Sequence, residues 1–307
     1  MRTTAFILLA FLGAASAQEG QPSTQLPSDL RDDAKLAAIV AAYSKGYGKD
    51  FGGAARNSTG EIVLRFLGRE FIYDDGKKKT FTDLLDRPDI EDTFSQTYPI
   101  QNPIDKLPEN FDPGRFRVED LFKALYGSNE SEVSHNCETV DFCGHKVKFN
   151  ARCGAADALR AVGKDLDALL AKNPALKEYV AELGGTFQWR FIAGTKRLSN
   201  HSFGNAIDLN VKKSSYWRWD PPSKLSSFTR KDWPTEIIEA FERHGFIWGG
   251  KWWHYDTMHF EFRPELIAHA RAHPSAPKPG PAGDEKDAKP ATKKKDDTLL
   301  PLNESER

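Results

Sequence analysis

Cysteine, methionine, long apolar runs and a surplus of either charge are all scarce in this chain of 307 residues. It has three cysteines, two methionines, and 43 Lys and Arg against 44 Asp and Glu, for a formal net charge of −1. A net charge near zero creates no global field that favours nucleic acid or an anionic membrane, so a polyanion-binding function has no support. No segment reaches the roughly 20 consecutive apolar residues that a membrane-spanning helix needs.

The first residues have the layout of a secretory signal peptide. Arg2 precedes an apolar run from Ala5 to Leu12, and small residues follow as far as Ala17. We therefore predict a signal peptide over residues 1–17, a mature chain that begins near Gln18, and a periplasmic or extracellular location. The alternative is an uncleaved N-terminal anchor, which the small residues at the cleavage site disfavour.

The three cysteines, Cys137, Cys143 and Cys153, lie in one short stretch. They form no C-x-x-C pair, which argues against a structural zinc ribbon. Disulfides form and persist in exported proteins, and an odd count leaves one thiol unpaired. We predict a bridge from Cys137 to Cys143, although sequence alone does not fix the connectivity.

The part of the chain between residues 18 and 135 predicts secondary structure but no chemistry. Apolar residues at helical spacing predict a helix over 33–47, and strand-like segments follow at 61–66 and 69–73. The proline-containing stretch 99–113 has little periodicity, so we expect it to wrap the surface of the next unit. With a short amphipathic helix over 118–126, we assign 18–135 to an N-terminal extension of unknown role.

Residues 136–273 predict a second unit of mixed helices and strands, which we expect to be the catalytic domain. The predicted elements are a strand over 145–150, helices over 155–171, 178–183 and 235–244, and a strand over 246–248. Residues 274–307 are rich in Pro, Lys, Asp, Ala and Gly and cannot bury enough apolar surface to offset their ordering entropy. We predict a disordered tail there, with wall anchoring as the alternative.

Two short segments of this second unit alternate polar and apolar side chains. In AIDLN, residues 206–210, Asp208 shares a face with residues 206 and 210, and in MHFEF, residues 258–262, His259 and Glu261 share a face. With His201 just upstream of a glycine turn, the imidazoles and carboxylates of these polar faces would supply three nitrogen or oxygen ligands to one divalent ion, most naturally zinc. Two histidines and one carboxylate leave the fourth position to water, which characterises a catalytic site. The alternative for such spacing is surface polarity or a hydrogen-bonded core histidine.

Other residues near these strands are candidates for supporting roles. Asp256 precedes His259 by three positions and is the candidate general base, and Glu261 is expected to orient the ligands without binding the ion. His254 either stabilises an oxyanion or caps a loop. Six tryptophans, at positions 217, 219, 233, 248, 252 and 253, would line a groove or form the core and lid of the domain.

The complete pattern resembles a known signature. S-x-H-x-x-G-x-A-x-D from residue 199, followed by D-x-x-H-F-E from residue 256, closely resembles the D-alanyl-D-alanine carboxypeptidase and L-alanyl-D-glutamate endopeptidase family of zinc peptidases. The resemblance, which covers about residues 146–264, implies zinc ligation by His201, Asp208 and His259 and a catalytic carboxylate at Asp256. The aspartate at the base position is similar to the endolysin-like L-alanyl-D-glutamate branch, whereas the carboxypeptidases more often have glutamate.

The same resemblance implies further properties of the protein. An arginine would bind the substrate carboxylate or the polarised carbonyl, with Arg190 the first candidate and Arg197 the second, and a plain salt bridge is the alternative for each. The fold would be α+β and hedgehog- or D-Ala-D-Ala-peptidase-like: a small antiparallel sheet that carries the zinc site, flanked by helices. The substrate would be a peptidoglycan stem peptide. An L-alanyl-D-glutamate endopeptidase is the first expectation, and a D-alanyl-D-alanine carboxypeptidase is the second. The rival functions are a non-catalytic zinc-stabilised binding module, which an intact Asp256 disfavours, and a structural exported domain without metal.

Overall fold

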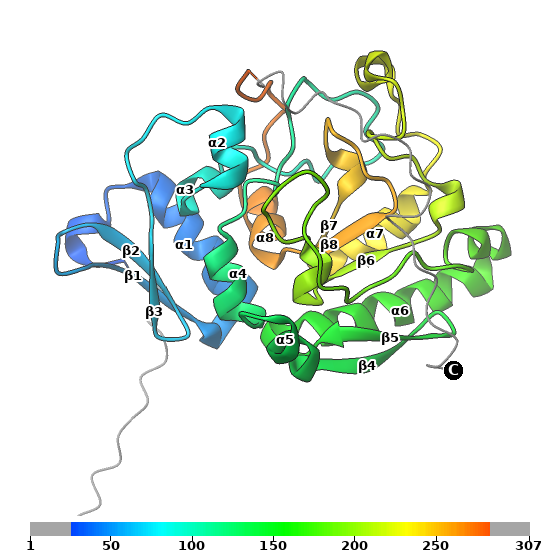
Figure 1. The fold of residues 1–307 in the computed structure, drawn as a ribbon, viewed down its shortest axis with the longest axis horizontal. Coiled ribbons are helices and arrows are strands. Elements are labelled where there is room, and N and C mark those ends of the chain that lie inside the picture. Colours follow the sequence, from blue (N-terminus) through cyan, green and yellow to red (C-terminus); the bar gives the residue numbers. More distant parts are fainter. Residues whose placement is uncertain (1–25, 283–307) are drawn as a thin grey trace, which may run out of the picture.

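The computed structural model describes residues 26–282 (Figure 1). The predicted signal peptide and the part of the predicted tail beyond residue 282 lie outside the described residues. Residues 274–282 form no helix or strand, and the Gly280 amide donates to the Glu109 carbonyl at 2.8 Å. No helix within 26–282 has both the length and the apolar character needed to cross a membrane.

The described chain contains α-helices, strands and short 3-10 helices in alternation. The α-helices are α1 (Ala34–Tyr47), α2 (Phe81–Asp86), α3 (Ile90–Thr93), α4 (Glu119–Tyr126), α5 (Glu130–Asn136), α6 (Ala155–Lys172), α7 (Thr235–Arg243) and α8 (Pro264–Ala272). The strands are β1 (Phe51–Arg56), β2 (Ile62–Phe66), β3 (Arg69–Ile72), β4 (Cys137–Phe142), β5 (His145–Asn150), β6 (Ala206–Asp208), β7 (Phe246–Trp248) and β8 (His259–Phe262). Among the 3-10 helices, η4 (Pro174–Tyr179), η5 (Asn200–Phe203) and η8 (Gly249–Lys251) lie near the site described below.

The N-terminal part consists of helix α1 and an antiparallel sheet in the order β1–β2–β3. Asp33 caps the N-terminus of helix α1: its side chain accepts the Leu36 amide at 2.9 Å and so satisfies one of the free donors of the first turn. Its buried face includes Ile39 and Tyr43 and packs on the C-terminal helix α8. One continuous cluster of buried apolar side chains therefore extends from Leu30 to Ala270. The division at residue 135 stays a prediction.

The second sheet is central to the molecule and has the antiparallel order β6–β8–β7 (Figure 1). Helix α7 packs on β7 and α6 packs on α7, while the β4–β5 hairpin covers the far side of α6. Helix α7 buries Ile237, Ile238 and Phe241 and exposes Glu236, so its amphipathic pattern fits a helix that backs a sheet. The prediction of an α+β fold with a small antiparallel sheet and flanking helices is confirmed.

Several predicted elements need correction. No disulfide forms, because the three cysteines are all free in this structure. Cys137 begins strand β4 and Cys143 lies just beyond its end, and six residues of extended chain span about 20 Å, whereas a disulfide needs Cα atoms within about 7 Å. The predicted helix over 178–183 is instead the 3-10 helix η4, which ends at Tyr179. Strands β1 and β4 were not predicted, although each pairs with a strand that was.

Candidate active site

His201 lies in a short turn whose geometry depends on a glycine. The 3-10 helix η5 ends at Gly204, which has φ +64°, and the Gly204 amide donates to the His201 carbonyl at 3.0 Å. A Cβ atom at this position would lie 2.7 Å from Cys137 Sγ, so both the backbone conformation and the available space require glycine. The turn holds the buried His201 imidazole beside the end of β6.

Asp208 and His259 face each other across two paired strands. In the antiparallel register of β6 and β8, Asp208 is opposite His259, and Ala206 is opposite Glu261. Side chains directly opposite each other in such a pair have Cβ atoms about 4.5–5.5 Å apart. The predicted polar face therefore exists and is buried except at Asp208, which is half-buried. Strand β6 ends at Asp208, so Asn210 is not part of this face.

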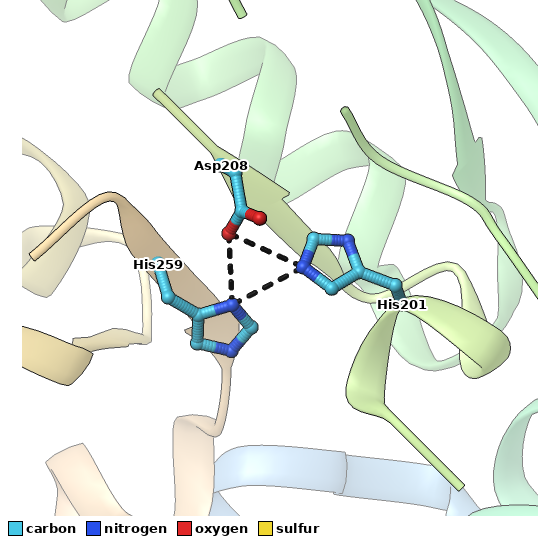
Figure 2. Close-up of side chains that lie close together, drawn as sticks. All are labelled: His201, Asp208 and His259. Atoms are coloured by element: carbon cyan, nitrogen blue, oxygen red, sulfur yellow. Dashed lines mark hydrogen bonds and ion pairs between the residues drawn. The ribbon is translucent and has the colours of Figure 1, made fainter. Parts of the chain in front are cut away.

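The three predicted ligands converge at one point (Figure 2). His259 Nδ1 lies 3.0 Å from Asp208 Oδ1, and His201 Nε2 lies 3.2 Å from both of those atoms. Zinc bonds of about 2.0–2.1 Å in a tetrahedral site place ligand atoms about 3.3 Å apart. The spacing of the two nitrogens and the carboxylate oxygen thus fits a divalent ion such as zinc. His201, Asp208 and His259 form a possible metal-binding group in the described part of the chain.

The second nitrogen of each imidazole is held by a hydrogen-bond acceptor. His201 Nδ1 donates to the Thr186 carbonyl at 2.6 Å, and His259 Nε2 donates to Glu261 Oε2 at 3.0 Å. These bonds orient the two rings so that the nitrogens that face Asp208 are the ones left to bind an ion. Burial lowers the pKa of His259, but Asp208 and Glu261 outweigh it and raise that pKa to about 10, so an ion would take the place of the proton on Nδ1. Glu261 also accepts from the Asn200 side-chain amide. It therefore has the orienting position that the sequence predicts.

Electrostatic pairing sets the charges of this cluster. Burial raises the pKa of Asp208, but His201 and His259 outweigh it and hold that pKa well below its usual range. Burial likewise raises the pKa of Glu261, but His259 and Arg263 lower it to about 2. Both carboxylates are therefore ionised at neutral pH.

Asp256 lies in the loop before β8 and differs from these two carboxylates. Burial and the nearby Asp208 charge raise the pKa of Asp256 to about 7, and His259, Arg190 and Arg115 oppose this only in part. Its Oδ1 atom is buried and has no hydrogen-bond partner within residues 26–282. A buried carboxylate with a free oxygen and a pKa near neutrality has the properties of a general base.

The ligand cluster and Asp256 line one cleft of about 1190 Å³. Its walls come from residues between 82 and 120, from the loop 190–201 and from residues 216–219. Trp217 and Trp219 line it, whereas Trp233 and Trp248 are buried in the core, so the tryptophans divide between the two predicted uses.

The stretch 99–113 does wrap the second unit, where the Phe111 carbonyl accepts the Trp253 amide at 2.7 Å.

The two candidate arginines have different surroundings. Arg190 lines the cleft, its charge lowers the pKa of Asp256, and its buried Nε has no hydrogen-bond partner in the described part of the chain. Arg197 also lines the cleft but pairs through Nε with Asp86 Oδ1 at 3.0 Å. The structure thus favours Arg190 as the arginine that is free to bind a substrate.

Several residues of the site were not predicted from sequence. Arg117 Nη1 donates to Asn200 Oδ1 at 2.6 Å and fixes the residue before His201. Asp112 accepts from the His254 ring, and Arg115 lines the cleft. All three lie in or beside the proline-containing stretch. Its composition predicted that it wraps the surface of the second unit, but no motif spacing predicted these contacts.

Two histidines and a carboxylate beside a second, buried carboxylate are a set of groups that metal-dependent hydrolases use. Residues 193–262 match the model of a family described as D-alanyl-D-alanine carboxypeptidase. The matched segment contains His201, Asp208, Asp256 and His259, and it supports a peptidase of this kind. No curated protein and no solved structure matches the chain.

Proposed function

We propose that this protein is an exported, zinc-dependent peptidase that hydrolyses an amide bond in peptidoglycan stem peptides. The observation that carries the proposal is the convergence of His201 Nε2, His259 Nδ1 and Asp208 Oδ1 beside the buried Asp256. The family match over the same segment supports the reaction class and the substrate class. The signal-peptide pattern at residues 1–17 supports export to a periplasm or the cell exterior.

His201, Asp208 and His259 would hold the zinc ion. Zinc in such a site supplies Lewis-acid chemistry, which polarises a carbonyl group and activates water. The Thr186 carbonyl and Glu261 hold the two imidazoles in the orientation in which they would bind the ion.

Asp256 carries the proton transfers in this mechanism. It accepts a proton from the attacking water as the new C–O bond forms, and it returns that proton to the amine as the C–N bond breaks. Burial and the Asp208 charge raise the pKa of Asp256 to about 7 in the metal-free protein, and this upward direction favours proton uptake from water. Arg190, whose guanidinium faces the same cleft, donates to the carbonyl oxygen as negative charge develops on it.

The bond that is cut is most consistent with an L-alanyl-D-glutamate endopeptidase. A cleft of about 1190 Å³ is larger than the 300–1,000 Å³ typical of a pocket for one small ligand, which favours an extended peptide over a dipeptide end. The aspartate at position 256 also agrees with the endopeptidase branch. A D-alanyl-D-alanine carboxypeptidase is the second candidate, because the description of the matching family favours it.

The test is digestion of purified stem pentapeptide by the zinc-loaded mature protein, with the products identified by mass spectrometry. Release of L-alanine from the N-terminal end would support the endopeptidase, and loss of one terminal alanine would make the protein a carboxypeptidase. The Asp256→Asn variant serves as the control, because it keeps the ligands and removes the base. If the intact protein binds zinc but cuts neither peptide nor whole sacculi, the enzyme proposal fails and a zinc-holding binding module replaces it.

A further inference from the structure

A buried carboxylate outside the family match holds two residues of the cleft. Asp112 is completely buried, and its Oδ1 accepts the His254 amide at 2.9 Å. Its Oδ2 accepts His254 Nδ1 at 2.6 Å and Arg115 Nη1 at 3.1 Å. His254 and Arg115 both line the cleft, together with the proposed zinc ligands.

The surrounding chain fixes Asp112 in this position. Its amide donates to Gln96 Oε1 at 2.7 Å, and Gln96 Nε2 donates to the Asn110 carbonyl at 2.7 Å. The next residue back along the chain, Phe111, accepts the Trp253 amide through its carbonyl at 2.7 Å. Backbone and side-chain bonds thus join segment 110–112 to segment 253–254, so the orientation of His254 is set by the fold.

The ring of His254 is clamped as well as hydrogen-bonded. It lies edge-on to Trp217 with ring centroids 4.7 Å apart and next to Phe81 with centroids 5.7 Å apart. With Nδ1 committed to Asp112, Nε2 is the nitrogen left to bind a ligand in the cleft. An Arg side chain has five N–H donors in a planar fork, of which the ion pair with Asp112 engages Nη1, so Arg115 can also donate to a ligand.

The charges of this group suit an anion. Burial raises the pKa of Asp112, but His254 and Arg115 lower it to about 2, so Asp112 is ionised at neutral pH. Because Asp112 is completely buried, an anion that enters the cleft meets the Arg115 guanidinium and the His254 ring rather than the carboxylate behind them. The Arg115 charge also lowers the pKa of Asp256, which places it within electrostatic reach of the proposed base.

The two candidate bonds share one chemical feature. In a terminal D-alanyl-D-alanine, the carbon next to the leaving nitrogen carries the free C-terminal carboxylate. In an L-alanyl-D-glutamate unit that continues through the γ-carboxyl group, the same carbon carries the free α-carboxylate of the glutamate. Either substrate therefore brings a carboxylate to within two bonds of the leaving nitrogen.

We propose that Asp112 holds His254 and Arg115 as a subsite for this substrate carboxylate, so that residues preceding the family match complete the active site. The inference rests on the proposed function, because it takes its ligand from the proposed substrate. It assigns a role to part of the N-terminal segment and separates two tasks, with Arg190 at the carbonyl and Arg115 and His254 at the carboxylate.

The test compares three pentapeptides on the zinc-loaded full chain: one with free carboxylates, one with a D-isoglutamine α-amide, and one with a C-terminal amide. Arg115→Gln and His254→Gln should each lower kcat/KM at least about ten-fold on the free peptide, mainly through KM, as expected for a lost hydrogen bond to a charged group. On the peptide whose relevant carboxylate is amidated, the same variants should differ little from wild type. The peptide on which the effect of the variants disappears identifies the carboxylate that is bound. This is the α-carboxylate of the glutamate for an endopeptidase and the C-terminal carboxylate for a carboxypeptidase.

Arg87→Gln is the matched control, because Arg87 lines the same cleft but pairs with Asp83 and is largely exposed. It should leave the preference for the free carboxylate unchanged. Equal losses on free and amidated peptides, or no loss, would overturn the inference while leaving the peptidase intact. If the wild-type protein cuts none of the peptides, isothermal calorimetry measures its affinity for each of them. Tighter binding of the free acid that depends on Arg115 supports the subsite. Binding without a preference for the free acid refutes it.

Discussion

His259 Nε2 lies 3.0 Å from Glu261 Oε2, and this pair connects the ligand cluster to a buried chain of charged groups. Arg263 Nη1 donates to Glu261 Oε1 at 3.1 Å, and Arg263 Nε donates to Glu265 Oε1 at 2.6 Å. Tyr47, at the end of helix α1, donates to Glu265 Oε2 at 2.9 Å. The N-terminal helix therefore supports the orientation of a proposed zinc ligand, even though the two are far apart in sequence.

Replacing Glu261 with Gln should weaken zinc binding by about 10–100-fold, because the His259 ring loses its anionic acceptor. Competition against a chelator of known affinity measures this directly and does not depend on catalysis. Glu239→Gln, the same change on the exposed side of α7, should leave the affinity unchanged. Equal affinities for Glu261→Gln and wild type would show that this bond has no influence on the metal.

Substitution of any proposed ligand should abolish stabilisation by zinc. At a free zinc concentration of 100 times Kd, binding to the native state adds about 2.7 kcal/mol to the free energy of unfolding and raises Tm. His201→Ala and Asp208→Ala should show no such rise in a thermal melt, whereas His135→Ala, at an exposed position on α5, should respond like wild type. A normal rise in the two ligand variants would place the ion elsewhere.

Substitutions of the two candidate arginines should lower kcat to different extents in steady-state kinetics. Arg190→Gln should lower kcat by about 10²–10³-fold, as the loss of a donor to a developing oxyanion does in other hydrolases. Arg197→Gln should have a much smaller effect, because its guanidinium is paired with Asp86. The reverse order would assign the carbonyl contact to Arg197.

Asp112 should make acid stability depend on pH in a defined direction. Its pKa in the folded state is about 2, below the roughly 3.9 of an unfolded aspartate, so its ionised form stabilises the native state. This contribution, about 2–3 kcal/mol, is fully present above about pH 5 and is lost as pH falls towards 2. The difference in unfolding free energy between wild type and Asp112→Asn should shrink over that range, and a constant difference would contradict the pairing.

The N-terminal part should unfold together with the candidate active site. Ile39 on α1 is completely buried in the common core, so Ile39→Ala should cost about 2–5 kcal/mol. Circular dichroism and zinc release should follow one shared transition at a lower temperature. Loss of the far-ultraviolet signal of α1 while zinc stays bound would instead support a domain boundary near residue 135.

Local patterns determined much of this protein. Apolar periodicity was enough to predict helices α1, α6 and α7, because each of these amphipathic helices buries its apolar face. Period-two alternation was enough to predict the polar faces of β6 and β8, which carry Asp208 and His259, and the motif resemblance added His201 to the candidate set. Strand β1 escaped prediction because its Phe-Gly-Gly-Ala-Ala stretch has low strand propensity and forms only by pairing with β2.

The surroundings of these three residues depend on contacts between distant parts of the chain. Asp112 and His254 are 142 positions apart, and no spacing rule links an irregular stretch to a loop at such a separation. The raised pKa of Asp256 likewise comes from burial and from the Asp208 charge, which depend on packing. The polar faces of the two strands could be predicted, because they follow from local periodicity. The ring orientations, the charges and the N-terminal wall of the cleft could not, because they depend on long-range contacts that arise only when distant segments pack together.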